Sequence, residues 1–353
     1  MSKPPSDRLQ ELDALRGIAA IIVVIFHYTT QYQELFGHVI PPVLPLPPGR
    51  YGVQLFFVIS GFVIFLTLTR ASSIWDFAAN RFSRLYPPYW ACIGITFAIM
   101  ACLPMPGLNV GIVDAIANLT MLQYWLQRPF VDGVYWTLAV ELIFYGFVSA
   151  LHLIGLLRRV ELWVSIWLAL IFVTQIIVQS GVNISPLIRT TLLLEHGHYF
   201  FAGVLFFRIR NEGFTWVRAA LILVCVAAAW VVRDVPHMLS LVAASAVFAV
   251  FVSGRLGWIA VGPLLFLGEI SYPLYLLHQH VGYTIIHSMQ KAGLVAEAWL
   301  FLPTFVAIGL STLVNRLVEK PARRWLRDVW KNSTLRHSLV KPNEKSPSSR
   351  PCD

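Results

Sequence analysis

One apolar segment near the N-terminus carries three ionisable side chains that could do chemistry. Residues 11–28 read "ELDALRGIAAIIVVIFHY" and contain Asp13, Arg16 and His27. An α-helix turns about 100° per residue, so the eleven steps from Arg16 to His27 make about three full turns and a rise of roughly 16 Å. Both side chains therefore lie on one helix face, and Asp13 can pair with Arg16.

Imidazole is well suited to proton transfer near neutral pH, so His27 is a candidate base. An alternative is that His27 is a buried neutral histidine bonded to a neighbour. Asp13 and Arg16 could likewise only mark the cytoplasmic edge of a membrane span. Ionisable groups inside a membrane are nevertheless costly, and they generally face the interior of a helical bundle.

A second polar cluster, "RFSRLYPPYW" at residues 81–90, contains two arginines. If these residues belong to an interfacial helix, Arg81 and Arg84 share a face, and Pro87 and Pro88 break that helix before a span resumes. Two guanidinium groups held together make a clamp for a phosphate or a carboxylate. The alternative is an ordinary cytoplasmic loop that binds anionic lipid headgroups.

A third cluster, "VYWTLAVELIFY" at residues 134–145, places Thr137, Glu141 and Tyr145 on one helical stripe with Trp136 beside it. A carboxylate two turns inside a membrane helix needs a partner. We expect Glu141 to face His27, although backbone or water could satisfy it instead.

A fourth cluster, "GEISYPLYLLHQH" at residues 268–280, repeats Ser271, Tyr275 and His278 along an otherwise apolar helix. Serine and tyrosine at such positions ordinarily bond neighbouring helices. The segment "LLEHGHYFF" holds Glu195, His196 and His198, but this close spacing without a further partner is a poor ligand set. We therefore predict no metal site.

The elements that carry these clusters must be membrane helices. The chain has 353 residues, of which 57% are hydrophobic and 13% charged, and a mean hydropathy of +0.67. This composition predicts an all-α polytopic membrane protein rather than a soluble domain. We expect ten spans, at approximately 10–30, 51–70, 85–104, 134–155, 160–180, 189–208, 215–233, 237–253, 261–287 and 297–318.

The distribution of positive charge predicts the orientation of these spans. With a cytoplasmic N-terminus and ten spans, few of the 27 lysine and arginine residues would lie outside, namely Arg50, Arg128, Arg189, Arg233 and Lys291. Both termini are then cytoplasmic. The net charge of +9 reflects this orientation rather than nucleic-acid binding. We expect a membrane domain over residues 1–330 and a disordered tail over 331–353. The four cysteines show no disulfide or zinc spacing.

Six motifs in this order resemble the acyltransferase 3 family of integral membrane acyltransferases. They are "LDALRGIAAIIVVIFH", "GVQLFFVISGFVI", "RFSRLYPPYW", "VYWTLAVELIFY", "GEISYPLYLLH" and "LVEKPARRWLR". The resemblance implies transfer of an acyl group, commonly acetyl, from cytoplasmic acyl-coenzyme A to a hydroxyl of a carbohydrate or glycolipid at the outer face of a bacterial plasma membrane. It implies no permanently bound cofactor. The chain looks like the form without a fused esterase-like domain.

The resemblance also carries functional residues over by position. The family's first-span arginine and histidine fall on Arg16 and His27, its paired arginines on Arg81 and Arg84, and its acid on Glu141. Many relatives have a second acid next, where this chain has Leu142. Direct transfer and an acyl-histidine intermediate are both compatible with these residues.

Two other functions remain open at this point. A proton-coupled solute transporter could use His27, Glu141 and His278 as a relay. A non-catalytic partner in envelope assembly would need the buried polar groups only for stability. The identity of the acceptor and the oligomeric state are not predicted.

Overall fold

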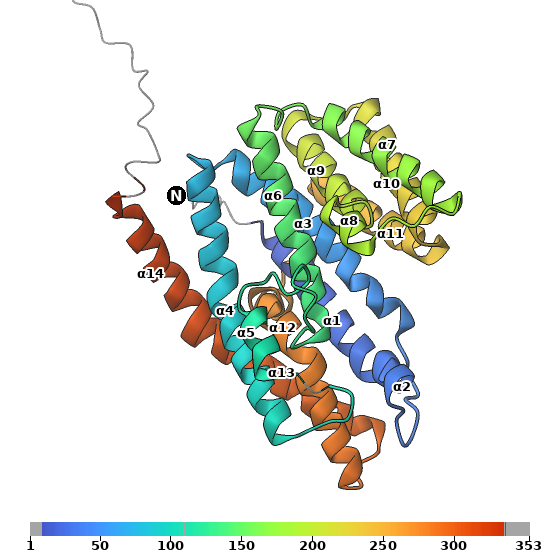
Figure 1. Ribbon diagram of the computed structural model, residues 1–353, viewed down its shortest axis with the longest axis vertical. Helices are drawn as coiled ribbons and strands as arrows, with labels where there is room; N and C mark the ends of the chain where they lie inside the picture. Colours follow the sequence, from blue (N-terminus) through green and yellow to red (C-terminus); the bar gives the residue numbers. More distant parts are fainter. Residues whose placement is uncertain (1–8, 109, 335, 337–353) are drawn as a thin grey trace, which may run out of the picture.

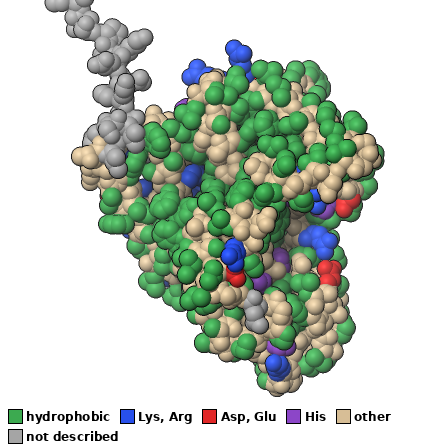
Figure 2. Space-filling view, in the orientation of Figure 1, with side chains coloured by type: hydrophobic (Ala, Val, Ile, Leu, Met, Phe, Trp, Pro, Cys, Tyr) green, Lys and Arg blue, Asp and Glu red, His purple; other side chains and the backbone are tan. Residues whose placement is uncertain are grey.

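The computed structural model describes residues 9–108, 110–334 and 336. All regular structure within these residues is helical, which confirms the predicted all-α class. Most of the predicted tail, residues 337–353, lies outside the described residues. Hydrophobic side chains cover most of the face drawn in Figure 2, as a lipid-facing surface requires.

Each of the ten predicted spans overlaps a long helix, although the helix in the span predicted at 189–208 begins only at Gly197. The bounds of these helices are α1 (Gln10–Phe26), α3 (Gly52–Thr69), α4 (Ile74–Cys102), α6 (Trp136–Leu153), α7 (Val160–Gln179), α9 (Gly197–Glu212), α10 (Trp216–Val232), α11 (Val235–Val252), α12 (Gly262–Lys291) and α13 (Phe301–Val314). Among the described residues, seven helical stretches are long and apolar enough to cross a membrane. The three remaining helices of the ten do not meet this criterion: α9 and α10 are short, and α12 is long but rich in polar residues. The protein is thus polytopic, and the count of ten remains a prediction.

Shorter elements connect or extend the long helices. They are η1 (His27–Gln31), α2 (Tyr32–Leu35), η2 (Pro47–Tyr51), α5 (Ile112–Asn118), η3 (Gly133–Tyr135), α8 (Pro186–Thr191), η4 (Gly257–Ile259), η5 (Glu297–Leu300), η6 (Asn315–Glu319) and α14 (Lys320–Lys331). Two of them, η1 and η6, are π-helical turns that continue α1 and α13. Such turns are rare and are frequently found at functional sites.

The helices form two groups joined by a central layer (Figure 1). In one group α7, α9, α10 and α11 pack together, and in the other α4, α12, α13 and α14 do so. Between them lie α1, which packs along α12, and α3, which packs along α9. The pairing of α1 with α12 positions the candidate residues, because both helices carry polar side chains that the sequence analysis identified.

Two glycines allow α1 and α12 to approach closely beside Arg16. A Cβ atom on Gly268 would lie 1.9 Å from the carbonyl oxygen of Asp13, and one on Gly17 would lie 2.5 Å from that of Leu264. Small residues at such crossings let membrane helices pack backbone against backbone. The close approach brings the polar face of α1 directly against α12.

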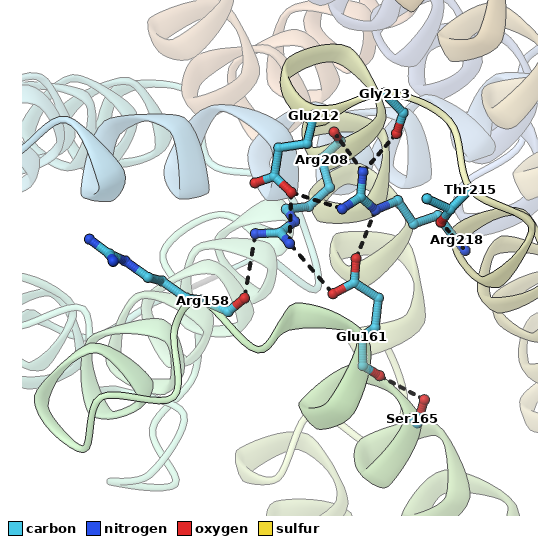
Figure 3. A network of polar contacts seen from close by, with 8 residues as sticks. All are labelled: Arg158, Glu161, Ser165, Arg208, Glu212, Gly213, Thr215 and Arg218. Atoms are coloured by element: carbon cyan, nitrogen blue, oxygen red, sulfur yellow. Dashed lines mark hydrogen bonds and ion pairs between the residues drawn. The ribbon is translucent and has the colours of Figure 1, made fainter.

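An ion network anchors α7, α9 and α10 at one end of the group that these helices form with α11 (Figure 3). Arg218 Nε donates to Glu161 Oε1 at 2.7 Å, and Arg218 Nη2 donates to Glu212 Oε2 at 2.8 Å. Arg208 Nη2 lies 2.7 Å from the same Glu212 oxygen. Paired charges of this kind tie three helices together without contacting the cavities described below.

One sequence prediction about α4 is wrong. Pro87 and Pro88 lie inside α4, which runs without interruption from Ile74 to Cys102. Proline removes a backbone donor and frees a carbonyl one turn earlier. Packing of α4 against α12 on one side and α14 on the other holds the helix through this weak point.

Candidate active site

A basic cavity of about 510 Å³ opens at the end of the bundle where α1 and α12 begin and α14 starts. By the predicted orientation this is the cytoplasmic end. Its charged lining comes from helices that are distant in sequence, and consists of Asp13, Arg16, Arg84, Glu269, Glu319, Lys320 and Arg323. Arg16 Nη1 lies 3.6 Å from Asp13 Oδ1, which confirms the predicted pairing. We call this space the mouth cavity.

A smaller inner cavity of about 70 Å³ lies next to the mouth cavity, with room for a few water molecules. Arg16 and Arg84 line both cavities and therefore stand at their junction. The polar lining of the inner cavity includes several predicted residues, namely Thr137, Glu141, Ser271 and Tyr275. The Ser271 hydroxyl donates to the Gly268 carbonyl at 2.8 Å, so this residue also links two turns of α12.

Glu141 lies in the inner cavity with Arg16 and Arg84. Its Oε1 accepts a hydrogen bond of 2.5 Å from the hydroxyl of Tyr145. The predicted stripe on α6 is therefore confirmed for Thr137, Glu141 and Tyr145. Trp136 points elsewhere, with its ring centroid 5.1 Å from that of His196.

The two arginines of the predicted clamp on α4 face different surroundings. Only Arg84 lines the cavities, whereas the guanidinium of Arg81 is buried between the rings of Phe77 and Tyr145, at 5.5 and 5.7 Å from their centroids. A spacing of three residues separates side chains by about 60° around a helix. This angle directs the Arg84 side chain towards the cavities and the Arg81 side chain towards Phe77 and Tyr145.

His27 is paired with His278. His27 begins the π-helical turn η1 and is buried, and His278 on α12 is fully buried. His278 Nε2 lies 3.2 Å from His27 Nδ1, and His27 Nδ1 also lies 2.8 Å from the Val23 carbonyl oxygen. The Tyr28 hydroxyl donates to the backbone carbonyl of His278 at 2.8 Å and so fixes α12 against the turn.

These contacts assign the hydrogens of the two neutral rings. His278 Nδ1 lies 2.9 Å from the Tyr275 carbonyl oxygen, which can only accept, so Nδ1 carries the hydrogen and Nε2 accepts. His27 Nδ1 then donates, since both of its neighbours are acceptors. The lone pair of His27 is consequently at Nε2. A base with its proton-accepting nitrogen fixed in this way suits general base or nucleophilic chemistry.

The expected contact between Glu141 and His27 is wrong. In the described part of the chain, Glu141 and His27 form no hydrogen bond or ion pair with each other. Glu141 lies at the level of Arg16, which is about 16 Å along α1 from His27, so one carboxylate cannot reach both. The residue that orients His27 is His278.

Tyr275 connects the inner cavity to the histidine pair. Tyr275 lines the inner cavity, and its hydroxyl accepts a hydrogen bond of 3.1 Å from Thr137 Oγ1. Its ring centroid lies 5.7 Å from that of His278. The cavities, Tyr275 and the two histidines thus form one continuous series along α1 and α12.

Two cations of the mouth cavity, Lys320 and Arg323 on α14, were not predicted from the sequence. They belong to the motif "LVEKPARRWLR" noted above. The positive charge of these two residues could have indicated a binding site. Positive charge at the cytoplasmic end of a membrane helix is also common without one, so the sequence did not distinguish the two explanations. Within the described part of the chain, no three His, Cys, Asp or Glu side chains are grouped to hold a metal ion.

Comparison with known proteins adds an identity to this geometry. A family model described as an acyltransferase domain matches residues 9–314. The chain belongs to the acyltransferase 3 family. This acyltransferase 3 protein is accordingly a multi-pass membrane enzyme that transfers acyl groups to oxygen.

Similar proteins cover most of the chain. Acyltransferase MdmB of Streptomyces mycarofaciens is 28% identical over 90% of this chain and 92% of its own length. Nodulation protein 10 of Rhizobium leguminosarum bv. viciae is 26% identical over 77% and 82%, respectively. The exopolysaccharide production protein ExoZ of Rhizobium meliloti (strain 1021) is 22% identical over 78% and 90%. No solved structure matches this acyltransferase 3 chain.

Proposed function

We propose that this acyltransferase moves an acetyl group from cytoplasmic acetyl-coenzyme A to a hydroxyl of a carbohydrate or glycolipid at the outer face of a bacterial plasma membrane, with His27 as the base. The observation that carries the proposal is the orientation of His27 by His278, which leaves the Nε2 lone pair available. The name of the exopolysaccharide-producing relative supports a carbohydrate acceptor. Family membership favours transfer over the transporter hypothesis.

The donor would enter through the mouth cavity, where cations attract its phosphates. Its pantetheine arm has about twelve chain bonds, which reach about 14 Å at the spacing of an extended peptide. This length is comparable with the roughly 16 Å that separates Arg16 from His27 along α1. The small volume of the inner cavity supports a short acyl group.

The reaction needs one proton acceptor and one good leaving group. His27 Nε2 removes the proton of the acceptor hydroxyl as its oxygen attacks the thioester carbonyl carbon. The carbon–sulfur bond then breaks, and the departing thiolate takes the proton back from His27. The same nitrogen could instead attack the thioester first and form acyl-His27, which the hydroxyl then cleaves. Rapid-quench detection of labelled protein distinguishes the two routes.

Glu141 has a different role in this proposal from the one expected from sequence. It offsets the charge of Arg16 and Arg84 at the junction of the cavities, and Tyr145 holds it in place. The Glu141 carboxylate therefore affects how the donor passes between the two cavities, and it does not affect the basicity of His27. Arg16 likewise acts on the donor and not on the reacting atoms.

Replacing His27 tests the proposal. Proteoliposomes containing wild-type or His27→Ala protein receive labelled acetyl-coenzyme A together with a hydroxyl acceptor from the native envelope, and transferred label is measured. We expect loss of at least a hundredfold in rate, because general base catalysis contributes about 10²–10⁴. His152→Ala, at an exposed histidine near the end of α6, serves as the matched control and should retain activity. Equal transfer by the His27 variant and the wild type would exclude His27 as the base.

A further inference from the structure

We propose that Arg84 and Arg323 together bind the phosphate groups of the acyl donor. This inference rests on the proposed function, because it names the part of the donor that the mouth cavity recognises. It replaces the predicted pair of Arg81 and Arg84 by a pair drawn from two helices, α4 and α14. Arg323 lies beyond residue 314, where the match to the family model ends.

Other charges around the mouth cavity form ion pairs that do not include these two arginines. Arg16 pairs with Asp13, and Lys320 pairs with Glu269. In the described part of the chain, neither Arg84 nor Arg323 forms an ion pair or hydrogen bond, and Arg323 Nε is buried without a hydrogen-bond partner. A buried guanidinium nitrogen without a partner is costly, so a ligand that supplies an acceptor would be bound favourably.

Glu319 explains how two like charges can face the same space. It lines the mouth cavity together with both arginines and accepts a hydrogen bond of 3.1 Å from Asn315 Nδ2. Asn315 and Glu319 bound the π-helical turn η6, which directs them into the cavity. The acid offsets part of the repulsion between Arg84 and Arg323 before a ligand binds.

The geometry suits a phosphate group. Two guanidinium groups on separate helices can each donate two hydrogen bonds to a phosphate, and a cavity of about 510 Å³ admits a nucleotide-sized group. Coenzyme A carries a diphosphate and a 3′-phosphate on its nucleotide half. A phospholipid headgroup or free phosphate offers the same chemistry, so the experiment below separates these sources.

The test compares donors with and without phosphate on the full-length protein in neutral phosphatidylcholine nanodiscs. Binding of acetyl-coenzyme A and of S-acetylpantetheine, which lacks every phosphate, is measured by calorimetry. We expect Arg323→Gln to weaken acetyl-coenzyme A binding by about 10- to 100-fold, as for loss of a charged hydrogen bond, and to leave S-acetylpantetheine binding unchanged. Arg84→Gln should behave alike.

Two further variants keep the result interpretable. Arg324→Gln alters the exposed neighbour on the same helix and should bind like the wild type. Arg323→Lys keeps the positive charge but lacks the paired N–H donors of the guanidinium group. It should bind acetyl-coenzyme A with intermediate affinity, even if the glutamine variant folds poorly.

Each outcome bears on one of the two proposals. If Arg323→Gln binds and transfers from acetyl-coenzyme A like the wild type, this inference is overturned and the proposed function stands. If the wild type binds no acetyl-coenzyme A, the proposed function fails as well. Competition by inorganic diphosphate supports the site. The binding measurement is repeated in nanodiscs that contain phosphatidylglycerol, and loss of acetyl-coenzyme A binding there would assign the site to a lipid headgroup and overturn the inference.

Discussion

Substitution of His278 provides the sharpest test of the proposed active site. In the structure, His278 uses Nδ1 to donate to backbone carbonyls of its own helix and Nε2 to accept from His27. A glutamine side chain can place an acceptor near the position of Nε2. An asparagine side chain reaches only the position of Nδ1. The pair His278→Gln and His278→Asn therefore changes the contact with His27 while keeping the same amide group.

The size of the effect follows from the charge that develops during transfer. When His27 Nε2 takes a proton, the ring becomes cationic and the hydrogen bond from Nδ1 to His278 becomes charge-assisted. Such a bond contributes about 1.5–3 kcal/mol, which corresponds to a rate factor of about 10–150. We expect His278→Asn to lower kcat by that factor and His278→Gln to stay within about fivefold of the wild type.

The assay is single-turnover acyl transfer at saturating donor, with donor affinity and thermal unfolding measured in parallel. A merely structural role for His278 would lower the unfolding temperature of both variants and reduce their rates equally. A positioning role instead changes kcat in the asparagine variant alone and leaves donor affinity unchanged. Equal rates for the two variants, or a wild-type rate for His278→Asn, would refute the inferred arrangement of hydrogens.

Two further predictions concern the scaffold. Gly268→Ala should destabilise the protein by about 1–3 kcal/mol or more, because the added Cβ meets the Asp13 carbonyl. In the control variant Gly309→Ala the added Cβ enters open space, so we expect no loss of stability. Thermal unfolding measures both variants. Arg218→Ala should cost about 1–3 kcal/mol, because Glu161 and Glu212 then keep only Arg208 as their ion-pair partner in the described part of the chain. Arg158→Ala at an exposed position should cost little, and a denaturant titration measures both variants. Identical unfolding curves within either pair would contradict the packing or the ion network described here.

Features that depend on neighbours along the chain were predictable from the sequence. Hydropathy located the long helices. Helical spacing correctly paired Asp13 with Arg16 and aligned Glu141 with Tyr145. In each case the partners belong to one helix, whose geometry is known without its surroundings.

Only the tertiary structure decided which residues meet across helices. His278 reaches His27 from 251 positions away, Glu141 stays at the level of Arg16, and Arg323 joins Arg84 from beyond the last predicted span. The rotation of each helix about its axis and the close crossing of α1 with α12 set these contacts. Such quantities arise from packing between helices, and periodicity within one helix does not contain them.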